Sequence, residues 1–358
     1  MADSKIHPVT VATKETIPLI DFSPFLVDEG VAVGKPPTDA QRKVAQCIDS
    51  ICREHGFLAM TNFGISASER DQLFAESAAL FALPDDVKRQ QLTRIAPATN
   101  TGYCPLQSEC INRSRPPELK EAFNFRFPPH HKNPLDNCPP TLGPFVEQVL
   151  LPKYIHLAQR YAVACAVALE IPDIDFFART LQKFDLCTLR MLHYPPCDWD
   201  DTNANDPADL SCALRIGEHT DFGFVTFLMV HPDHGPEGLQ IKAVDGGEVG
   251  GQAAGESEGW HDVVLPPTEG REPVIIVNTG ALMARWTNDE WKATAHRVIV
   301  PDAAAAARSR YSIACFIDPD VDSMVAVHPS FVSKSSSSYQ PIKSIDYLMQ
   351  KLQSMMKA

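Results

Sequence analysis

The chain has 358 residues, of which 44% are hydrophobic and 22% are charged, a composition typical of ordinary globular proteins. This composition argues against a largely disordered chain, and no stretch is long and apolar enough to span a bilayer. The 45 acidic residues outnumber the 32 basic ones, so the formal net charge of −13 disfavours nucleic acid and anionic membranes as partners.

The first residues, up to Pro18, lack the basic start and apolar stretch of a secretory signal, so we expect a cytoplasmic protein. The ten cysteines form no CxxC pair, which argues against a disulfide framework and a zinc ribbon. The sequence does not determine the oligomeric state, and a monomer is favoured.

The first part of the chain alternates between strand and helix signals. Residues 17–25 and 57–65 are typical of short strands, whereas residues 39–56 and 66–83 carry helical patterns, the first of them ending at Gly56. Residues 96–144 are rich in Pro, Asn and Ser and show little periodicity. We expect this segment to be irregular and to cover a functional region.

The second half is dominated by strand signals. Residues 145–170 form the longest helical pattern, with Pro152 expected at a break. After residue 180, seven short apolar stretches separated by turn residues predict an antiparallel barrel or jelly roll. An amphipathic helix is expected over residues 344–356.

Two polar residues precede the apolar stretch "GFVTFLMV". His219 and Asp221 are two positions apart, so in an extended strand their side chains share a face and offer two adjacent metal ligands. A lone HxD pair is weak evidence, but His296, in another predicted strand, supplies a third ligand. Two histidines and one carboxylate suit Fe(II) with open positions, although zinc accepts the same ligands.

Arg310 and Ser312 repeat this spacing on a later strand. A buried guanidinium needs an anion, and its planar fork beside a hydroxyl suits a carboxylate. The anion is either an organic acid or one of the chain's own Asp and Glu side chains, and the pattern alone favours neither.

The order of the motifs is more specific than any one of them. "IPLIDFSPF", "REHGFLAMTNFGI", "LFALPDDVKRQ", "HYPPCD", "EHTDFGFVTFLM", "NTGALMARWTND", "AHRVIVP" and "RYS" follow one another along nearly the whole chain. In this respect the sequence resembles the iron(II) and 2-oxoglutarate-dependent dioxygenases of the isopenicillin N synthase-like group.

The resemblance implies a role for each matched position. His219, Asp221 and His296 would bind Fe(II). Arg310 and Ser312 would bind the distal carboxylate of 2-oxoglutarate, with a hydrogen bond from Tyr194, while O2 would be the other cosubstrate. Leu192 replaces an Asn that is frequent in the family, which weakens the expectation for cosubstrate contacts on that strand.

The resemblance also implies a fold of mixed α and β structure. A double-stranded β-helix (jelly-roll) core would be flanked by helices and preceded by an N-terminal α/β extension. The expected division is an N-terminal dioxygenase region with a substrate lid at 1–145, a supporting helix at 146–180, the catalytic core at 181–320, and a C-terminal tail and helix at 321–358.

Substrate contacts are expected from aromatic and other side chains near these motifs: Phe123, Phe125, Arg126, Phe222, Phe224, Met283, Trp286 and Phe316. Each of them, taken alone, is better explained by a place in the core. Basic residues of the irregular segment, among them Arg113, Arg115 and Arg126, suggest a substrate that carries a carboxylate, although ordinary surface charge explains them too.

The predicted function is therefore an Fe(II)- and 2-oxoglutarate-dependent oxygenase of specialised metabolism. It would hydroxylate, desaturate or cyclise a small molecule. One alternative is an iron oxidase of the same fold that does without 2-oxoglutarate, and Arg310 with Ser312 counts against it. The others are a zinc hydrolase and a metal-dependent binding protein without catalysis.

Overall fold

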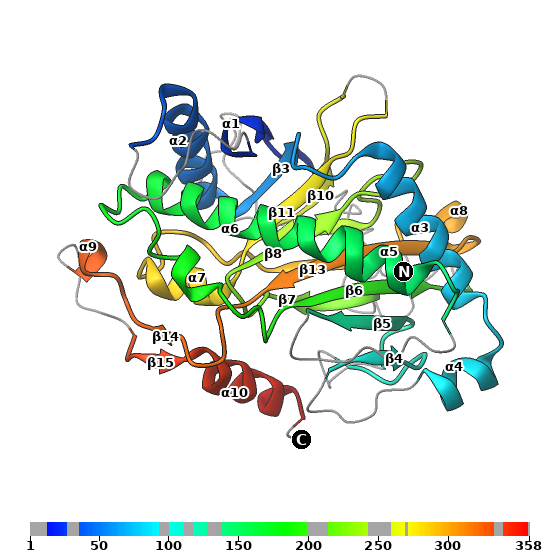
Figure 1. Cartoon of the computed structure of the whole chain (residues 1–358). Coiled ribbons are helices and arrows are strands. Elements are labelled where there is room, and N and C mark those ends of the chain that lie inside the picture. Colours follow the sequence, from blue (N-terminus) through cyan, green and yellow to red (C-terminus); the bar gives the residue numbers. More distant parts are fainter. Residues whose placement is uncertain are drawn as a thin grey trace, which may run out of the picture.

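The structure is a computed structural model, which describes residues 13–26, 36–92, 100–110, 117–127, 138–198, 214–242, 259–268, 271–332 and 339–356. Two sheets form its centre (Figure 1). The larger sheet has eight strands in the order β2-β3-β11-β8-β13-β6-β5-β4, and the smaller has five in the order β1-β10-β9-β12-β7. The structure thus has the mixed α and β character that the sequence predicts.

The larger sheet combines strands from both halves of the chain. The first half supplies β2 (Leu19–Asp21), β3 (Phe57–Thr61), β4 (Gly102–Cys104) and β5 (Glu121–Arg126). The second half supplies β6 (Thr188–Tyr194), β8 (Val225–Met229), β11 (Ile275–Thr279) and β13 (Arg310–Ile317). The division of the chain into four parts stays a prediction. Strands of the expected N-terminal region pair in one sheet with strands of the expected catalytic core.

The smaller sheet contains β1 (Thr13–Thr16), β7 (Leu214–His219), β9 (Leu239–Lys242), β10 (Trp260–Val264) and β12 (His296–Ile299). All seven strands expected after residue 180 are present, and β7 is an additional one. An antiparallel pair of short strands, β14 (Met324–Val325) and β15 (Ile342–Lys343), is separate from both sheets.

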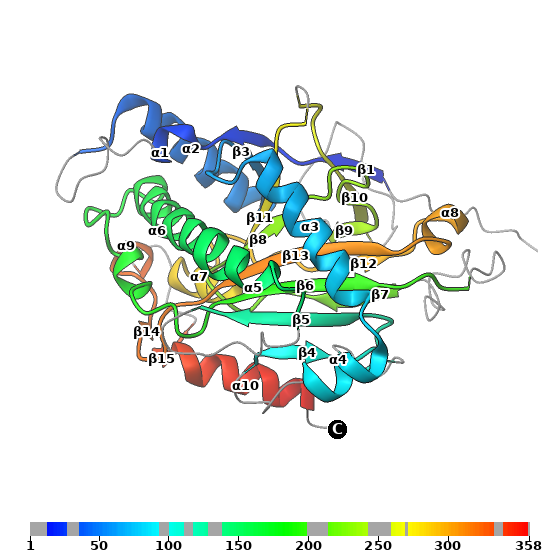
Figure 2. The same ribbon diagram turned by 45° about the vertical axis from the view of Figure 1, so that its right-hand side comes forward.

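Helices cover one face of the larger sheet (Figure 2). The principal ones are α2 (Asp39–Glu54), α3 (Ala67–Phe81) and α6 (Leu151–Ala168), and their apolar side chains meet Leu58, Phe227 and other residues of that sheet face in the main hydrophobic core. Capping boxes at Thr38 and Ser66 begin α2 and α3, because each side chain satisfies a free N–H group of the first turn.

The region around Pro152 is a break, as expected. A short helix α5 (Leu142–Phe145) passes into a π-helical turn over Val146–Leu150, and α6 then begins with the proline in its first turn. Proline is tolerated there because the first N–H groups of a helix have no partner within it.

The remaining helices are short, except for α10 (Ser344–Met356), which confirms the predicted C-terminal helix. Both views place it below β4 and β5 (Figures 1 and 2). The short helices are α1 (Ser23–Leu26), α4 (Asp85–Gln91), α7 (Ala281–Trp286), α8 (Ala303–Ala306), α9 (Pro329–Val332) and a 3-10 turn at Ala178–Thr180.

Candidate functional site

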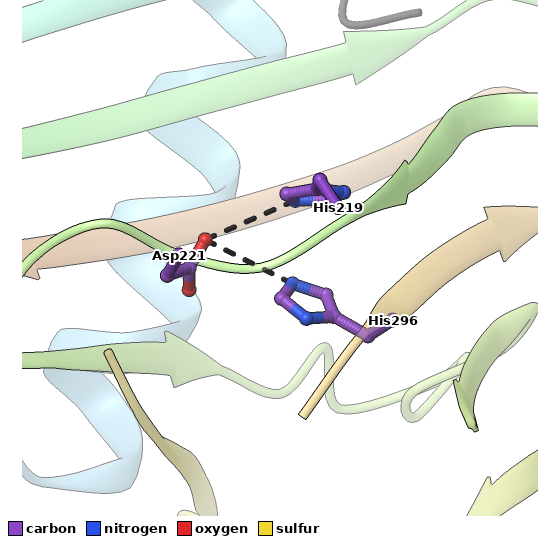
Figure 3. Close-up of side chains that lie close together, drawn as sticks. All are labelled: His219, Asp221 and His296. Carbon is purple, nitrogen blue, oxygen red and sulfur yellow. Dashed lines mark ion pairs between the residues drawn. The ribbon is translucent and has the colours of Figure 1, made fainter. Parts of the chain in front are cut away.

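Three residues that could hold a metal converge where the smaller sheet ends. His219 is the last residue of β7, Asp221 lies in the turn that follows, and His296 is the first residue of β12, directly opposite His219 in the β7–β12 register. One ligand atom from each of the three lies within 4.8 Å of the others (Figure 3). The HxD pair therefore begins not in the apolar strand β8, as expected, but at the end of the strand before it.

Hydrogen bonds orient both imidazoles. The Nδ1 atom of His219 lies 2.8 Å from the carbonyl oxygen of Gly217, and the Nδ1 atom of His296 lies 3.2 Å from that of Thr294. Each Nδ1–H is thus directed at the backbone, so each Nε2 points toward Asp221 with its lone pair. The Nε2 atoms lie 3.8 and 3.9 Å from Oδ1 of Asp221.

The carboxylate of Asp221 is held from the opposite side. Its Oδ2 accepts hydrogen bonds from Thr226 at 2.5 Å and from Asn278 at 2.7 Å, which come from β8 and β11. Oδ1 is left facing the two imidazoles. The three donors thus present one oxygen and two nitrogens to a single point.

The protonation states at the site suit a cation. Burial, and then the charge of His296, lower the pKa of His219 to about 4, so its imidazole is neutral at physiological pH. Burial alone would raise the pKa of Asp221, but the two histidines and the hydrogen bonds from Thr226 and Asn278 lower it, so this carboxylate is ionised. Metal binding requires neutral imidazoles and an ionised carboxylate, and the side chains of His219 and Asp221 meet this requirement.

Two glycines allow the chain to pass close to the site. A Cβ on Gly280 would lie 2.1 Å from the carbonyl oxygen of Gly223, and a Cβ on Gly223 would lie 2.3 Å from Oδ1 of Asp318. The amide of Ala281 also donates to the carbonyl of Asp221 at 2.8 Å. The turn that carries Asp221 is therefore packed directly against the start of α7.

Arg310, Ser312 and Tyr194 share one face of the larger sheet. Arg310 pairs with Tyr194 in the β13–β6 register, and its guanidinium lies 5.1 Å from the centre of that ring. Its Nε donates to the carbonyl oxygen of Glu237 at 2.9 Å, whereas Nη1 is buried and has no hydrogen-bond partner in the described part of the chain. Burial lowers the pKa of Arg310.

No carboxylate of the described residues forms an ion pair with this arginine. A buried guanidinium with an unused donor, next to the Ser312 hydroxyl, is a site for an external anion. The arrangement therefore favours an organic acid over one of the chain's own carboxylates.

Sequence reasoning missed Arg215, a second buried guanidinium beside Tyr194. It lies 5.6 Å from the centre of the Tyr194 ring, and one amino group donates to the carbonyl of Ala305 at 3.0 Å. Burial, followed by the charge of Arg310, lowers its pKa. Arg215, Gly217 and His219 alternate along β7, so a predicted β7 would have placed Arg215 on the same strand face as the metal ligand His219. The sequence analysis did not predict β7.

The expected substrate residues divide into two groups. Phe222 and Phe316 are partly exposed, and Phe316 is on the same sheet face as Arg310 and Ser312. The others are buried: Arg126 bonds to the Leu186 carbonyl and the Thr188 hydroxyl, while the main core contains Phe123, Phe125, Phe224, Met283 and Trp286.

The positions of Phe123 and Phe125 correct the expectation of substrate contact. Both side chains are fully buried on the helix side of β5, and the alternation of side chains along the strand puts Ala122 and Asn124 on the face that includes Tyr194. Phe224 and Trp286 likewise pack against Phe177. Arg113 and Arg115 lie outside the described residues.

Two protein-family profiles match the chain. Residues 17–144 match the N-terminal region of non-haem dioxygenases described for morphine synthesis, and residues 186–319 match the 2OG-Fe(II) oxygenase superfamily. Among curated proteins, a 2-oxoglutarate-dependent dioxygenase of Didymella fabae is 30% identical over 321 residues, covering 86% of each chain. The 2-oxoglutarate-dependent dioxygenase citB of Monascus ruber is 28% identical over 340 residues, covering 88% of each.

Solved structures give the same result. Full-length T7H of Neurospora crassa in complex with α-ketoglutarate has a TM-score of 0.70 and 29% identity, covering 94% of this chain and 96% of that one. A putative 2OG-Fe(II) oxygenase family protein of Caulobacter crescentus, at 22% identity and a TM-score of 0.71, is similar in fold over 95% of this chain and 99% of that one.

The double-stranded β-helix and the two-histidine, one-carboxylate cluster together define a non-haem iron oxygenase. The chain belongs to the 2-oxoglutarate/Fe(II)-dependent dioxygenases, and its cofactor and cosubstrates are Fe(II), 2-oxoglutarate and O2. Within the described residues, no helix combines the length and apolar character needed to cross a membrane.

Proposed function

We propose that His219, Asp221 and His296 bind the iron, and that Arg310, Ser312 and Tyr194 bind the distal carboxylate of 2-oxoglutarate. The observation that carries the first assignment is the convergence of the three donor atoms within 4.8 Å, with the carboxylate held from behind by Thr226 and Asn278. A cytoplasmic location and a monomeric state remain part of this proposal.

The second assignment rests on the charge and burial of Arg310. Its buried Nη1 has no hydrogen-bond partner among the described residues, and Arg310 as a whole is 5% exposed. The guanidinium fork can donate two parallel hydrogen bonds to a carboxylate, and the Ser312 hydroxyl, on the same face, can donate a third. Arg215 adds a second positive charge close to Tyr194.

The reaction oxidises a small molecule. Iron held by these residues, together with 2-oxoglutarate and O2, would supply the oxidising power to break a C–H bond of the substrate, with 2-oxoglutarate converted to succinate and carbon dioxide. The protein fixes the ligand geometry through the Gly217 and Thr294 carbonyls and the position of Asp221 through β8 and β11. Hydroxylation, desaturation or ring closure then depends on how the substrate is held.

Small-molecule chemistry is supported by the relatives. T7H of Neurospora crassa, 28% identical, has been solved with thymine and with 5-formyluracil, so a protein of this fold binds small planar molecules. We place this chain in specialised metabolism, as the sequence analysis predicts, and the fungal relatives it matches are 2-oxoglutarate-dependent dioxygenases.

An anaerobic titration with Fe(II) and 2-oxoglutarate tests both assignments. The chelated cosubstrate gives a visible charge-transfer band. We expect the band in the wild type, its loss in His219→Ala because a ligand is missing, and a raised 2-oxoglutarate requirement in Arg310→Ala because the distal carboxylate loses its partner.

Matched controls separate these effects from general damage. His234→Ala removes a histidine outside the cluster, and Arg179→Ala removes an arginine whose partner is the exposed Asp173. Both should keep the wild-type band. The ligand assignment would be refuted by a folded His219→Ala protein that still forms the band.

A further inference from the structure

A polar pair on β5 and β6 is not used by the reaction described above. Asn124 and Arg190 are register partners, and the alternation along β6 places Arg190 on the same sheet face as Tyr194. Figure 2 shows β5, β6 and β13 side by side. Arg190 is also the register partner of Ala314 on β13. It therefore lies on the sheet face that carries Arg310 and Ser312, next along that face after the Ser312–Leu192 pair.

Arg190 has a carboxylate partner that does not come from a neighbouring strand. Its Nη2 donates to Oε2 of Glu109, a residue of the segment between β4 and β5, and Lys120 Nζ lies 3.8 Å from the same oxygen. Lys120 has its own partner in Glu118, with which it forms an ion pair. Glu109 is therefore the carboxylate that balances the charge of Arg190.

The exposed fractions show which residues of this cluster, formed by Arg190, Glu109, Lys120 and Glu118, are enclosed. The side chains of Lys120 and Glu118 are 5% and 7% exposed, whereas those of Arg190 and Glu109 are 14% and 27% exposed. Burial, followed by the charge of Arg190, lowers the pKa of Lys120 to about 8. The Lys120–Glu118 pair is thus closed, and the Arg190–Glu109 pair is the more accessible one.

The cluster is joined to the iron site by the backbone of β7. Oε1 of Glu118 accepts a hydrogen bond from the amide of Gly217 at 3.2 Å, and the carbonyl of Gly217 is the partner of His219 Nδ1. The charge of Lys120 also contributes to the low pKa of His219. Arg190 is therefore linked to a metal ligand through Glu109, Lys120, Glu118 and the backbone of Gly217.

Asn124 supplies a second, independent observation. It is fully buried, and its Nδ2 donates to Oδ1 of Asn100 at 2.9 Å. Its own Oδ1 is buried and lacks a hydrogen-bond partner in the parts of the chain that the structure describes. A buried acceptor is seldom left unsatisfied in a protein, so Oδ1 of Asn124, beside the register partner Arg190, points to a donor that the described residues do not supply.

We propose that Arg190 is a substrate-binding residue, and that the substrate carries a carboxylate which takes the place of Glu109, with Asn124 accepting a hydrogen bond from an adjacent N–H or O–H group. This inference rests on the proposed function for the position of the iron and of 2-oxoglutarate. Exchanging one carboxylate for another leaves the charge balance of the cluster unchanged, so the partly buried Arg190 is never left without a counterion.

A small carboxylate can test the site without knowledge of the full substrate. The probe is [1-13C]propionate, added to protein loaded with Mn(II) and saturated with 2-oxoglutarate, and its carboxylate relaxation is followed by NMR. Mn(II) stands in for Fe(II) and enhances relaxation only for molecules bound near the metal. Propionamide, which has the same shape and no charge, is the matched probe.

Glu109→Ala should bind propionate roughly tenfold more tightly than the wild type, because Arg190 loses its internal partner. Glu109→Gln keeps the side-chain volume and should show a smaller gain, which guards against a folding defect in the alanine variant. Arg190→Leu combined with Glu109→Ala should abolish the gain, and propionamide should bind equally weakly to all of these proteins.

Three results would overturn the proposal: no gain in either Glu109 variant, a gain that survives Arg190→Leu, or a gain that propionamide shares. Failure of the proposed function has a different signature. The wild type would then give no charge-transfer band with Fe(II) and 2-oxoglutarate, a readout that involves neither Arg190 nor Glu109, and that result would remove the basis of this inference as well.

Discussion

Asp221 shows how single side chains prepare the iron site. One carboxylate oxygen is occupied by Thr226 and Asn278, and the other faces two imidazoles whose Nδ1 atoms are bonded to the backbone. Every rotation that could turn a donor away from the metal is thus opposed by a hydrogen bond. The cost of ordering these groups is met during folding and not during metal binding.

Removing the support of Asp221 should therefore weaken iron binding without removing a ligand. For Asn278→Ala we expect metal affinity to fall by about 10- to 100-fold, the usual effect of losing such a partner. Anaerobic Fe(II) titration of the purified variant measures the change. Thr226→Ser, which keeps the hydroxyl, should stay close to the wild type.

If Asn278→Ala binds Fe(II) as tightly as the wild type does, its hydrogen bond has no part in positioning Asp221. A circular-dichroism spectrum and a melting curve for each variant would show whether weaker binding reflects a local change or partial unfolding.

At the residue scale, the sequence predicted the identity of the clustered side chains better than their surroundings. His219, Asp221 and His296 were identified from residue type and motif order, and the structure brings them together. Phe123 and Phe125 were expected to contact the substrate because they belong to the irregular segment that was expected to cover the site. Which face of β5 points inward depends on the β5–β6 register, which local sequence does not contain.

Between elements, a buried polar network joins α4, β4, β5 and β6. Glu121 accepts hydrogen bonds from Tyr103 and, at 2.8 Å, from Lys88, and its other oxygen lies 2.7 Å from Nδ1 of His193. The Nε2 atom of His193 lies 3.0 Å from the hydroxyl of Ser309. His193 directly precedes Tyr194 and Ser309 directly precedes Arg310, so this network fixes the β6–β13 ladder at the proposed cosubstrate site.

Glu121→Gln should destabilise the protein near neutral pH by about 3 kcal/mol, because Lys88 is left as a buried charge without its counterion. Burial would raise the pKa of Glu121, but the hydrogen bonds from His193, Lys88 and Tyr103 lower it below the usual 4.5. The stabilisation is therefore complete above pH 4.5 and is lost as the pH falls through the folded-state pKa.

Urea unfolding of wild type and Glu121→Gln over a series of pH values measures this dependence. The difference in the free energy of unfolding should be constant above pH 4.5 and shrink at lower pH. Glu54→Gln, at a side chain that is 66% exposed, is the control and should change little. A difference that stays constant down to the acid transition would show that the carboxylate charge is not what stabilises the network.

Element prediction succeeded where the pattern was periodic and bounded. The helices α2 and α3 have capping residues and an apolar face, and the strands after residue 180 are separated by turn residues. β5 was missed because its short alternation, "FNFR", lies in a segment rich in Pro, Asn and Ser that was expected to be irregular. β7 was missed because "LRIGEH" is too polar to resemble a core strand.

For the molecule as a whole, the iron and 2-oxoglutarate sites link ligand binding to stability. Ligands that bind only the folded protein raise the free energy of unfolding by about 2.7 kcal/mol at a concentration of 100 times their dissociation constant. Differential scanning calorimetry with Mn(II) and 2-oxoglutarate should therefore show a higher melting temperature in the wild type.

The two ligands should be separable in this experiment. His219→Ala should lose the increase due to both, because 2-oxoglutarate binds partly through the metal, whereas Arg310→Ala should keep the increase due to Mn(II) and lose most of that due to 2-oxoglutarate. An undiminished increase in His219→Ala would place the stabilising metal elsewhere on the protein.

The larger sheet also has a consequence for the synthesis of the protein. β3, whose five residues are all buried, pairs with β11, so Met60 lies opposite Ile275. At cellular rates of translation, the second strand leaves the ribosome on the order of ten seconds after the first. During that interval an apolar strand edge has no partner. We therefore expect newly made chains to require holding by chaperones until β11 and β13 emerge, and fragments that end before residue 275 to aggregate.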